Sequence, residues 1–142
     1  MKKIFLTIVL GLIAVGCSLD KPSIDVACKP PYDVRIYHEG RPTSTFTITN
    51  SPLGLKIQDW LMTNPNDWHI SYITYAPSIE IRNDNMSLNF TAGVAVLNIK
   101  NSSNGKWGQF IREVDMSTTG FLREIIIRAE SPGARDSSVH KP

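Results

Sequence analysis

Residues 79–100 read IEIRNDNMSLNFTAGVAVLNIK, and this stretch decides the predicted fold. Apolar residues occupy every second position in residues 79–82 and again in 86–91, which predicts two strands with one buried face each. The Asn-Asp-Asn run at 83–85 is a turn sequence, so these strands should pair as a hairpin. Residues 94–99 follow closely and are apolar on both faces, which adds a third antiparallel strand.

The alternation also predicts the register of the strand at residues 86–91. Leu88 and Phe90 should point into the core, while Ser87 and Asn89 should point outward to solvent. A change at one of the apolar positions should therefore affect folding more than a change at a polar one.

Further runs rich in β-branched and aromatic residues extend this sheet on both sides. They are residues 33–38, 44–49, 69–75 and 107–114. Gly40-Arg41-Pro42 supplies the turn between the first two, and 69–75 reads as a central strand because it is apolar on both faces. The connections are too short for crossovers, so the strands should be antiparallel.

Two segments have helical spacing. Ser51-Pro52 is a cap followed by a residue suited to the first helical position, and an apolar stripe follows until Asn64-Pro65. The stripe consists of Leu53, Ile57, Trp60 and Leu61.

Residues 119–129 are ambiguous. Leu122, Ile125, Ile126 and Ala129 fit a helix, with an expected ion pair from Glu124 to Arg128, whereas the β-branched run Ile125–Ile127 favours a strand. We expect a helix, because the charged residues then share the other face. The predicted fold is α+β: a single antiparallel sheet of about six or seven strands with two helices packed on one face.

The N-terminus has the features of a targeting sequence. Lys2 and Lys3 precede an apolar run over residues 4–13, too short to span a bilayer, and Ala14-Val15-Gly16-Cys17 ends it. This segment resembles a bacterial lipoprotein signal, a secretory leader with a lipobox. The resemblance implies cleavage before Cys17 and lipidation of that cysteine, hence an anchor in the cell envelope. Ser18 in place of Asp implies the outer membrane, facing the periplasm.

The chain therefore divides into four parts: a signal peptide at 1–16, a lipidated flexible tether at 17–31, a globular domain at 32–130 and a disordered tail at 131–142. Cys28 is the one cysteine besides Cys17, so no internal disulfide is expected in the mature chain.

Charge argues against a nucleic-acid partner. The chain has 15 Lys and Arg residues and 13 Asp and Glu residues. Because Lys2 and Lys3 leave with the leader, the mature chain has equal numbers of each. No run of basic residues occurs, and a basic face is the usual signature of nucleic-acid binding.

No catalytic or metal-binding motif is present. The sequence lacks the nucleophile, zinc, phosphate-loop and dinucleotide signatures, and His38, His69 and His140 are too widely spaced for a local metal site. We therefore expect no cofactor and no enzymatic activity, although an enzyme without a recognisable motif stays an alternative.

The predicted binding surface lies where the first helix gives way to the next strand. It comprises Asp67, Trp68, His69, Tyr72 and Tyr75. Loops on a rigid scaffold often carry binding residues, and Trp and Tyr supply much of the energy of protein contacts. The competing interpretation is that Trp68 and one tyrosine simply close the core.

The predicted function is a membrane-anchored binding module of the immunity, exclusion or inhibitor type, which captures another protein at the envelope. A structural or assembly lipoprotein is the alternative, and a small envelope enzyme is the second alternative.

Overall fold

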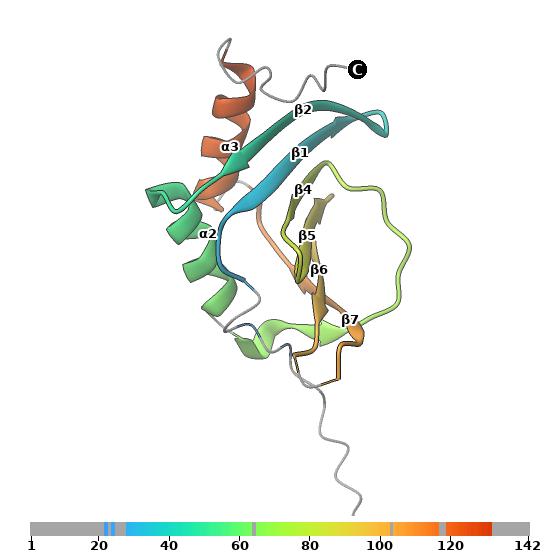
Figure 1. Cartoon of the computed structure of the whole chain (residues 1–142). Coiled ribbons are helices and arrows are strands. Elements are labelled where there is room, and N and C mark those ends of the chain that lie inside the picture. The colour runs from blue at the N-terminus through green and yellow to red at the C-terminus, as the bar shows by residue number, and fades with distance from the viewer. Residues whose placement is uncertain are drawn as a thin grey trace, which may run out of the picture.

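The computed structural model describes residues 22, 24, 28–63, 65–102, 104–116 and 119–131. The predicted leader, the predicted lipidation site Cys17 and residues 132–142 lie outside them. The described residues form two layers, an antiparallel sheet and a pair of helices on one of its faces (Figure 1). The predicted α+β fold is confirmed.

The sheet of the described chain has seven strands in the order β2-β1-β4-β5-β6-β7-β3, and every pairing is antiparallel. The strands are β1 (Tyr32–His38), β2 (Arg41–Ile48), β3 (His69–Ile70), β4 (Ile79–Arg82), β5 (Met86–Thr91), β6 (Val94–Lys100) and β7 (Trp107–Glu113). Glu39 and Gly40 join β1 to β2 with positive φ angles of 50° and 74°, as a tight hairpin requires. Arg41 and Pro42, predicted as turn residues, already belong to β2.

The hairpin at the centre of the sheet forms as predicted. Ile81 lies opposite Leu88, which in turn lies opposite Leu97, and all three are buried. Asn83 Oδ1 accepts backbone hydrogen bonds from Asn85 and Met86, both at 2.9 Å, and this fixes the turn. Local sequence and cross-strand packing therefore select the same register.

The helices are α2 (Pro52–Met62) and α3 (Gly120–Glu130), and a short 3-10 helix, η1 (Pro65–Asp67), follows α2. Ser51 Oγ caps α2 by accepting a hydrogen bond from Gly54 N at 3.3 Å.

The ambiguous segment is a helix, as expected, because Phe121, Leu122 and Ile125 bury one face against the sheet. The predicted partner of Glu124 is wrong: its carboxylate pairs with Lys56 of α2, while Arg128 lies over the ring of Phe46.

The core fills the space between sheet and helices, and a cluster of aromatic rings packs together there. Trp60 of α2 contacts Trp68, Phe90 and Phe121, with ring centroids 5.5–6.1 Å apart. Edge-to-face and tilted arrangements of this kind are the favourable ones for aromatic pairs.

The domain begins earlier than residue 32. Ile24 and Cys28 are both buried in the core. The hydroxyl of Tyr32 donates to the carbonyl of Cys28, and burial raises the pKa of Tyr32 above its ordinary value. Part of the predicted tether therefore belongs to the folded domain, because the side chains of Ile24 and Cys28 are buried in its core.

The prediction of a central strand at 69–75 is wrong. β3 contains only His69 and Ile70 and lies at the edge of the sheet, paired with β7. Beyond it, Tyr72 and Ile73 are exposed. A short apolar run on both faces does not distinguish a buried strand from an exposed apolar segment, and here the pattern belongs to the second kind.

The sheet face opposite the helices is polar and partly covered. Ser87 and Asn89 lie on this face as the register requires, yet Asn89 is only 3% exposed. Its Nδ2 atom donates to Ser87 Oγ at 2.9 Å, so the buried amide is paired. The expectation that Asn89 reaches solvent is therefore wrong.

Candidate functional site

The five residues of the predicted surface separate into exposed and buried members. Asp67 at the end of η1 and His69 on β3 are exposed, whereas Trp68 between them is 5% exposed and belongs to the core. Tyr72 is 88% exposed, and Tyr75 is half-buried. Of the two tyrosines, Tyr72 is therefore the one whose side chain is exposed enough to contact a partner.

Trp68 packs on Trp60, and Arg112 of β7 lies over both indole rings. Its guanidinium carbon lies 3.9 Å from the ring centroid of Trp60 and 5.2 Å from that of Trp68. Its Nη1 atom donates to the carbonyl of Thr63 at 3.2 Å. Burial lowers the pKa of Arg112, and nearby Asp67 acts in the opposite direction. Arginine stays protonated in proteins, so this guanidinium is a cation over two indole rings. Trp68 therefore has a structural role, and the core interpretation holds for it.

The segment after β3, residues 71–78, is here called the strap. It leaves the edge strand β3 and rejoins the sheet at β4, an interior strand that lies between β1 and β5 (Figure 1). Gln109 of β7 fixes its start: the backbone carbonyl of Gln109 accepts from Ser71 N at 3.1 Å, and its Oε1 accepts from Ile73 N at 2.9 Å. Between these two anchored amides, the side chain of Tyr72 projects into solvent.

A second polar contact fixes the middle of the strap. Asn98 of β6 donates to the hydroxyl of Tyr75 at 2.6 Å, and Gln109 Nε2 donates to Asn98 Oδ1 at 3.2 Å. Asn98 and Gln109 lie directly opposite each other on neighbouring strands. The two amides therefore form a connected support that positions the strap on the sheet.

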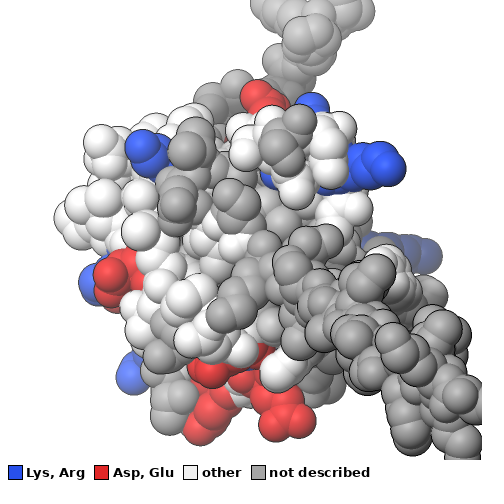
Figure 2. Space-filling view, turned by 90° about the horizontal axis from the view of Figure 1, so that it is seen from below, with Lys and Arg blue, Asp and Glu red and all other residues white. Residues whose placement is uncertain are grey.

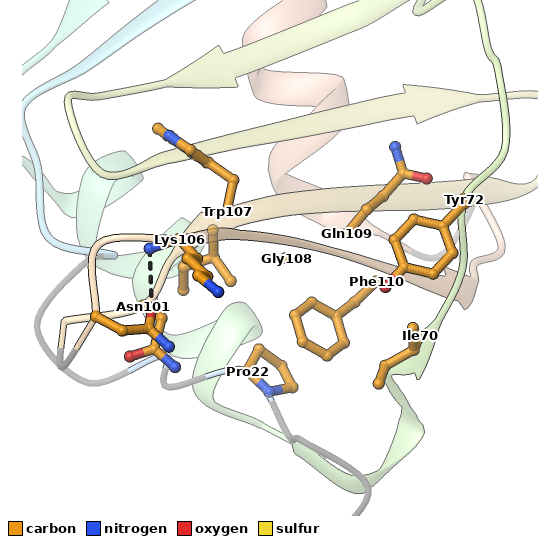
Figure 3. A pocket seen from close by; sticks show the side chains of 11 residues that line it. Pro22, Ile70, Tyr72, Asn101, Lys106, Trp107, Gly108, Gln109 and Phe110 are labelled. Atoms are coloured by element: carbon orange, nitrogen blue, oxygen red, sulfur yellow. Dashed lines mark hydrogen bonds between the residues drawn. The ribbon is translucent and has the colours of Figure 1, made fainter.

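A pocket of about 220 Å³ opens beside the strap, at the end of the sheet where β6 and β7 are joined (Figure 3). In Figure 3, Tyr72 lies near Ile70 and Phe110, whereas the side chain of Trp107 points away from them toward the other side of β7. Ile70, Tyr72 and Trp107, which we call the rim, are 43%, 88% and 55% exposed. Large apolar side chains that are exposed together around a pocket are typical of a binding surface.

The pocket combines an apolar base with hydrogen-bonding groups. Phe110 and Ile99, both largely buried, supply the base, and Gly108 lets the Phe110 ring lie close, since a Cβ atom there would stand 3.0 Å from that ring. The polar groups around it are the side chains of Asn101, Asn104, Lys106 and Gln109. One apolar side chain of a ligand fits this space, with amides and an ammonium group at its border.

Two of the three rim residues were not predicted from the sequence. Ile70 was assigned to a buried central strand, and Trp107 had no assigned face. The available signal was the register: Trp107 starts a strand after a polar turn, opposite Lys100, so it lies on the sheet face away from the helices.

Within the described ranges, no group of three or more His, Cys, Asp and Glu side chains is arranged to hold a metal ion. No helix in the same ranges is long and apolar enough to cross a membrane. Comparisons with protein families, curated proteins and solved structures give no match for this chain.

Proposed function

We propose that this protein is a lipid-anchored binding module of the bacterial envelope, most consistent with an outer-membrane lipoprotein facing the periplasm. The resemblance of residues 1–17 to a lipoprotein signal supports the anchor at Cys17. The exposed apolar side chains of the rim support a binding role, which we propose to be non-catalytic. Its proposed ligand is another protein.

The exposure of Tyr72 and Trp107 at an apolar pocket carries this proposal. Tyr72 is 88% exposed, so its side chain adds little packing to the fold. The strap that carries it is nevertheless fixed by three hydrogen bonds to Gln109 and Asn98, and a fourth joins those two amides. A rigid backbone that presents an aromatic side chain reduces the entropy lost on binding. Tyr and Trp are also enriched among the residues that dominate protein interfaces.

Co-isolation from membranes tests the binding role. The tagged protein is isolated from detergent-solubilised membranes of its native cell, as wild type and as a Tyr72→Ala/Trp107→Ala double variant. Each interface anchor contributes about 2 kcal/mol or more, which is roughly a 30-fold change in affinity, so the double variant should lose the co-isolated protein.

Leu55→Ala is the matched control, because Leu55 is also an exposed apolar residue but lies on α2. It should retain the partner fully. A partner that is retained equally by the wild type, the double variant and the control would rule out the rim as the binding surface.

A further inference from the structure

The start of the folded chain lies at the rim. Pro22 lines the same pocket as Tyr72 and Trp107, and Ile24 is already buried in the core. Figure 3 shows the ring of Pro22 near Phe110 and Ile70. Pro22, the first described residue of the chain, therefore lies at the pocket.

The distance from the anchor to the rim is bounded by chain length. Four residues lie between Cys17 and Pro22, which makes five steps from one Cα atom to the next. A fully extended chain spans at most about 3.6 Å per step, or about 18 Å in total. An acylated Cys17 lies at the headgroup level of the bilayer, because its acyl chains enter the hydrocarbon. The pocket is then held within about 18 Å of the membrane surface.

This bound keeps the end of the domain that holds the pocket close to the membrane. The joined ends of β6 and β7 lie at the bottom of Figure 1, the end that Figure 2 views directly. Lys and Arg residues appear in Figure 2 as separate spots and not as one patch, while acidic residues gather along one edge. Among the residues that Figure 2 colours, Lys and Arg therefore form no single basic patch at this end.

The rim instead offers the side chains that prefer a membrane–water interface. Trp and Tyr concentrate at the headgroup level of membrane proteins, because an apolar ring is combined with a polar group. Trp107 and Tyr72 are the two exposed aromatic residues at the pocket, and Ile70 adds an aliphatic side chain. The charged side chain among the pocket residues is Lys106, which suits a phosphate-bearing surface.

We propose that the rim rests on the lipid headgroups whenever the anchored protein has no partner. The inference rests on the lipid anchor of the proposed function. The bilayer covers the exposed aromatic residues in this resting state, and a protein partner must reach the rim at the membrane surface and displace the lipid there.

Fluorescence quenching by brominated lipid tests the contact. The acylated protein is purified, its acylation is confirmed by intact mass, and it is reconstituted into vesicles of phosphatidylethanolamine and phosphatidylglycerol at a 3:1 ratio. Part of the lipid carries bromine close to the headgroup. Trp60 and Trp68 belong to or pack against the core, so the difference between wild type and Trp107→Phe isolates Trp107. We expect quenching in the wild type and its loss in Trp107→Phe.

A second variant tests the role of the short tether. Twenty Gly and Ser residues inserted between Lys21 and Pro22 release the domain from the membrane, so quenching of Trp107 should fall by more than half. Equal quenching with and without the insertion contradicts the claim that the short segment between Cys17 and Pro22 holds the rim at the membrane. Equal quenching of wild type and Trp107→Phe, in protein whose mass shows the acyl chains, overturns the membrane contact and leaves the partner-binding proposal standing. A mass without acyl chains refutes the anchor itself.

Discussion

Replacement of Trp68 by Ala and by Phe separates the two roles that a tryptophan can have in this region. Trp68 is 5% exposed, packs edge-to-face on Trp60 with centroids 6.1 Å apart, and lies under the guanidinium of Arg112. Truncation of a buried Trp to Ala costs about 3–5 kcal/mol. The lost contact with Arg112 adds about 1 kcal/mol at a partly buried site.

Trp68→Phe should behave differently, because the indole nitrogen contributes nothing favourable. Nε1 is buried, and no described residue accepts a hydrogen bond from it. An unpaired buried donor costs about 1–3 kcal/mol, so its removal offsets much of the loss in ring area. We expect the free energy of unfolding of Trp68→Phe to lie within about 1.5 kcal/mol of the wild-type value. This change is much smaller than the loss expected for Trp68→Ala.

Urea denaturation followed by far-ultraviolet circular dichroism measures both variants without relying on tryptophan emission. With an m-value of about 1–3 kcal/mol/M, a loss of about 4 kcal/mol lowers the midpoint by more than 1 M. Trp107→Ala is the matched control, since Trp107 is exposed and should change stability by less than about 1 kcal/mol. Equal losses for Trp68→Ala and Trp107→Ala would refute the assignment of Trp68 to the core.

Three further predictions concern stability. Phe90→Ala should cost about 3–5 kcal/mol, whereas Asn89→Ala should cost about 1 kcal/mol through its hydrogen bond to Ser87; urea melts with equal losses would contradict the register. Gly54→Ala should lower the thermal midpoint despite the better helix propensity of Ala, because the new Cβ would stand 2.6 Å from the carbonyl oxygen of Thr49; a raised midpoint would show that α2 shifts freely. Burial raises the pKa of Tyr32 in the folded state. The contribution of Tyr32 to the free energy of unfolding is therefore present below the unfolded pKa of about 10 and is lost as the pH rises beyond it. Tyr32→Phe should reduce this alkaline loss of stability, and an unchanged dependence of stability on pH would refute the prediction.

The fold could be predicted because its signals are local. Alternation in β4 and β5, the Asn83 turn and the Ser51 cap each fix an element without help from distant residues. The helix α3 could be predicted only as the better of two alternatives, since the Ile125–Ile127 run satisfies both periodicities. What decided it is the burial of Phe121, Leu122 and Ile125 under tertiary packing.

The candidate site could be predicted only in part, because its location depends on contacts between distant residues. Tyr72 was identified by residue type, but its exposure depends on the hydrogen bonds that Gln109 makes to the strap. The sequence does not show that Trp68 is buried, because its burial depends on contacts with residues elsewhere in the chain, such as Trp60 and Arg112. Ile70 and Tyr72 come to lie near Trp107 because β3 pairs with β7, and these two strands are far apart in the chain.

Site-specific photo-crosslinking in the native cell tests the central claim most directly. A photoreactive phenylalanine analogue replaces Tyr72 or Trp107 on the rim, and Leu55 or Ile127 on the helices, where all four side chains are exposed. The account predicts one discrete protein adduct from both rim positions and none from the helix positions. The same adduct from Leu55 and Ile127, with none from Tyr72 and Trp107, would contradict it.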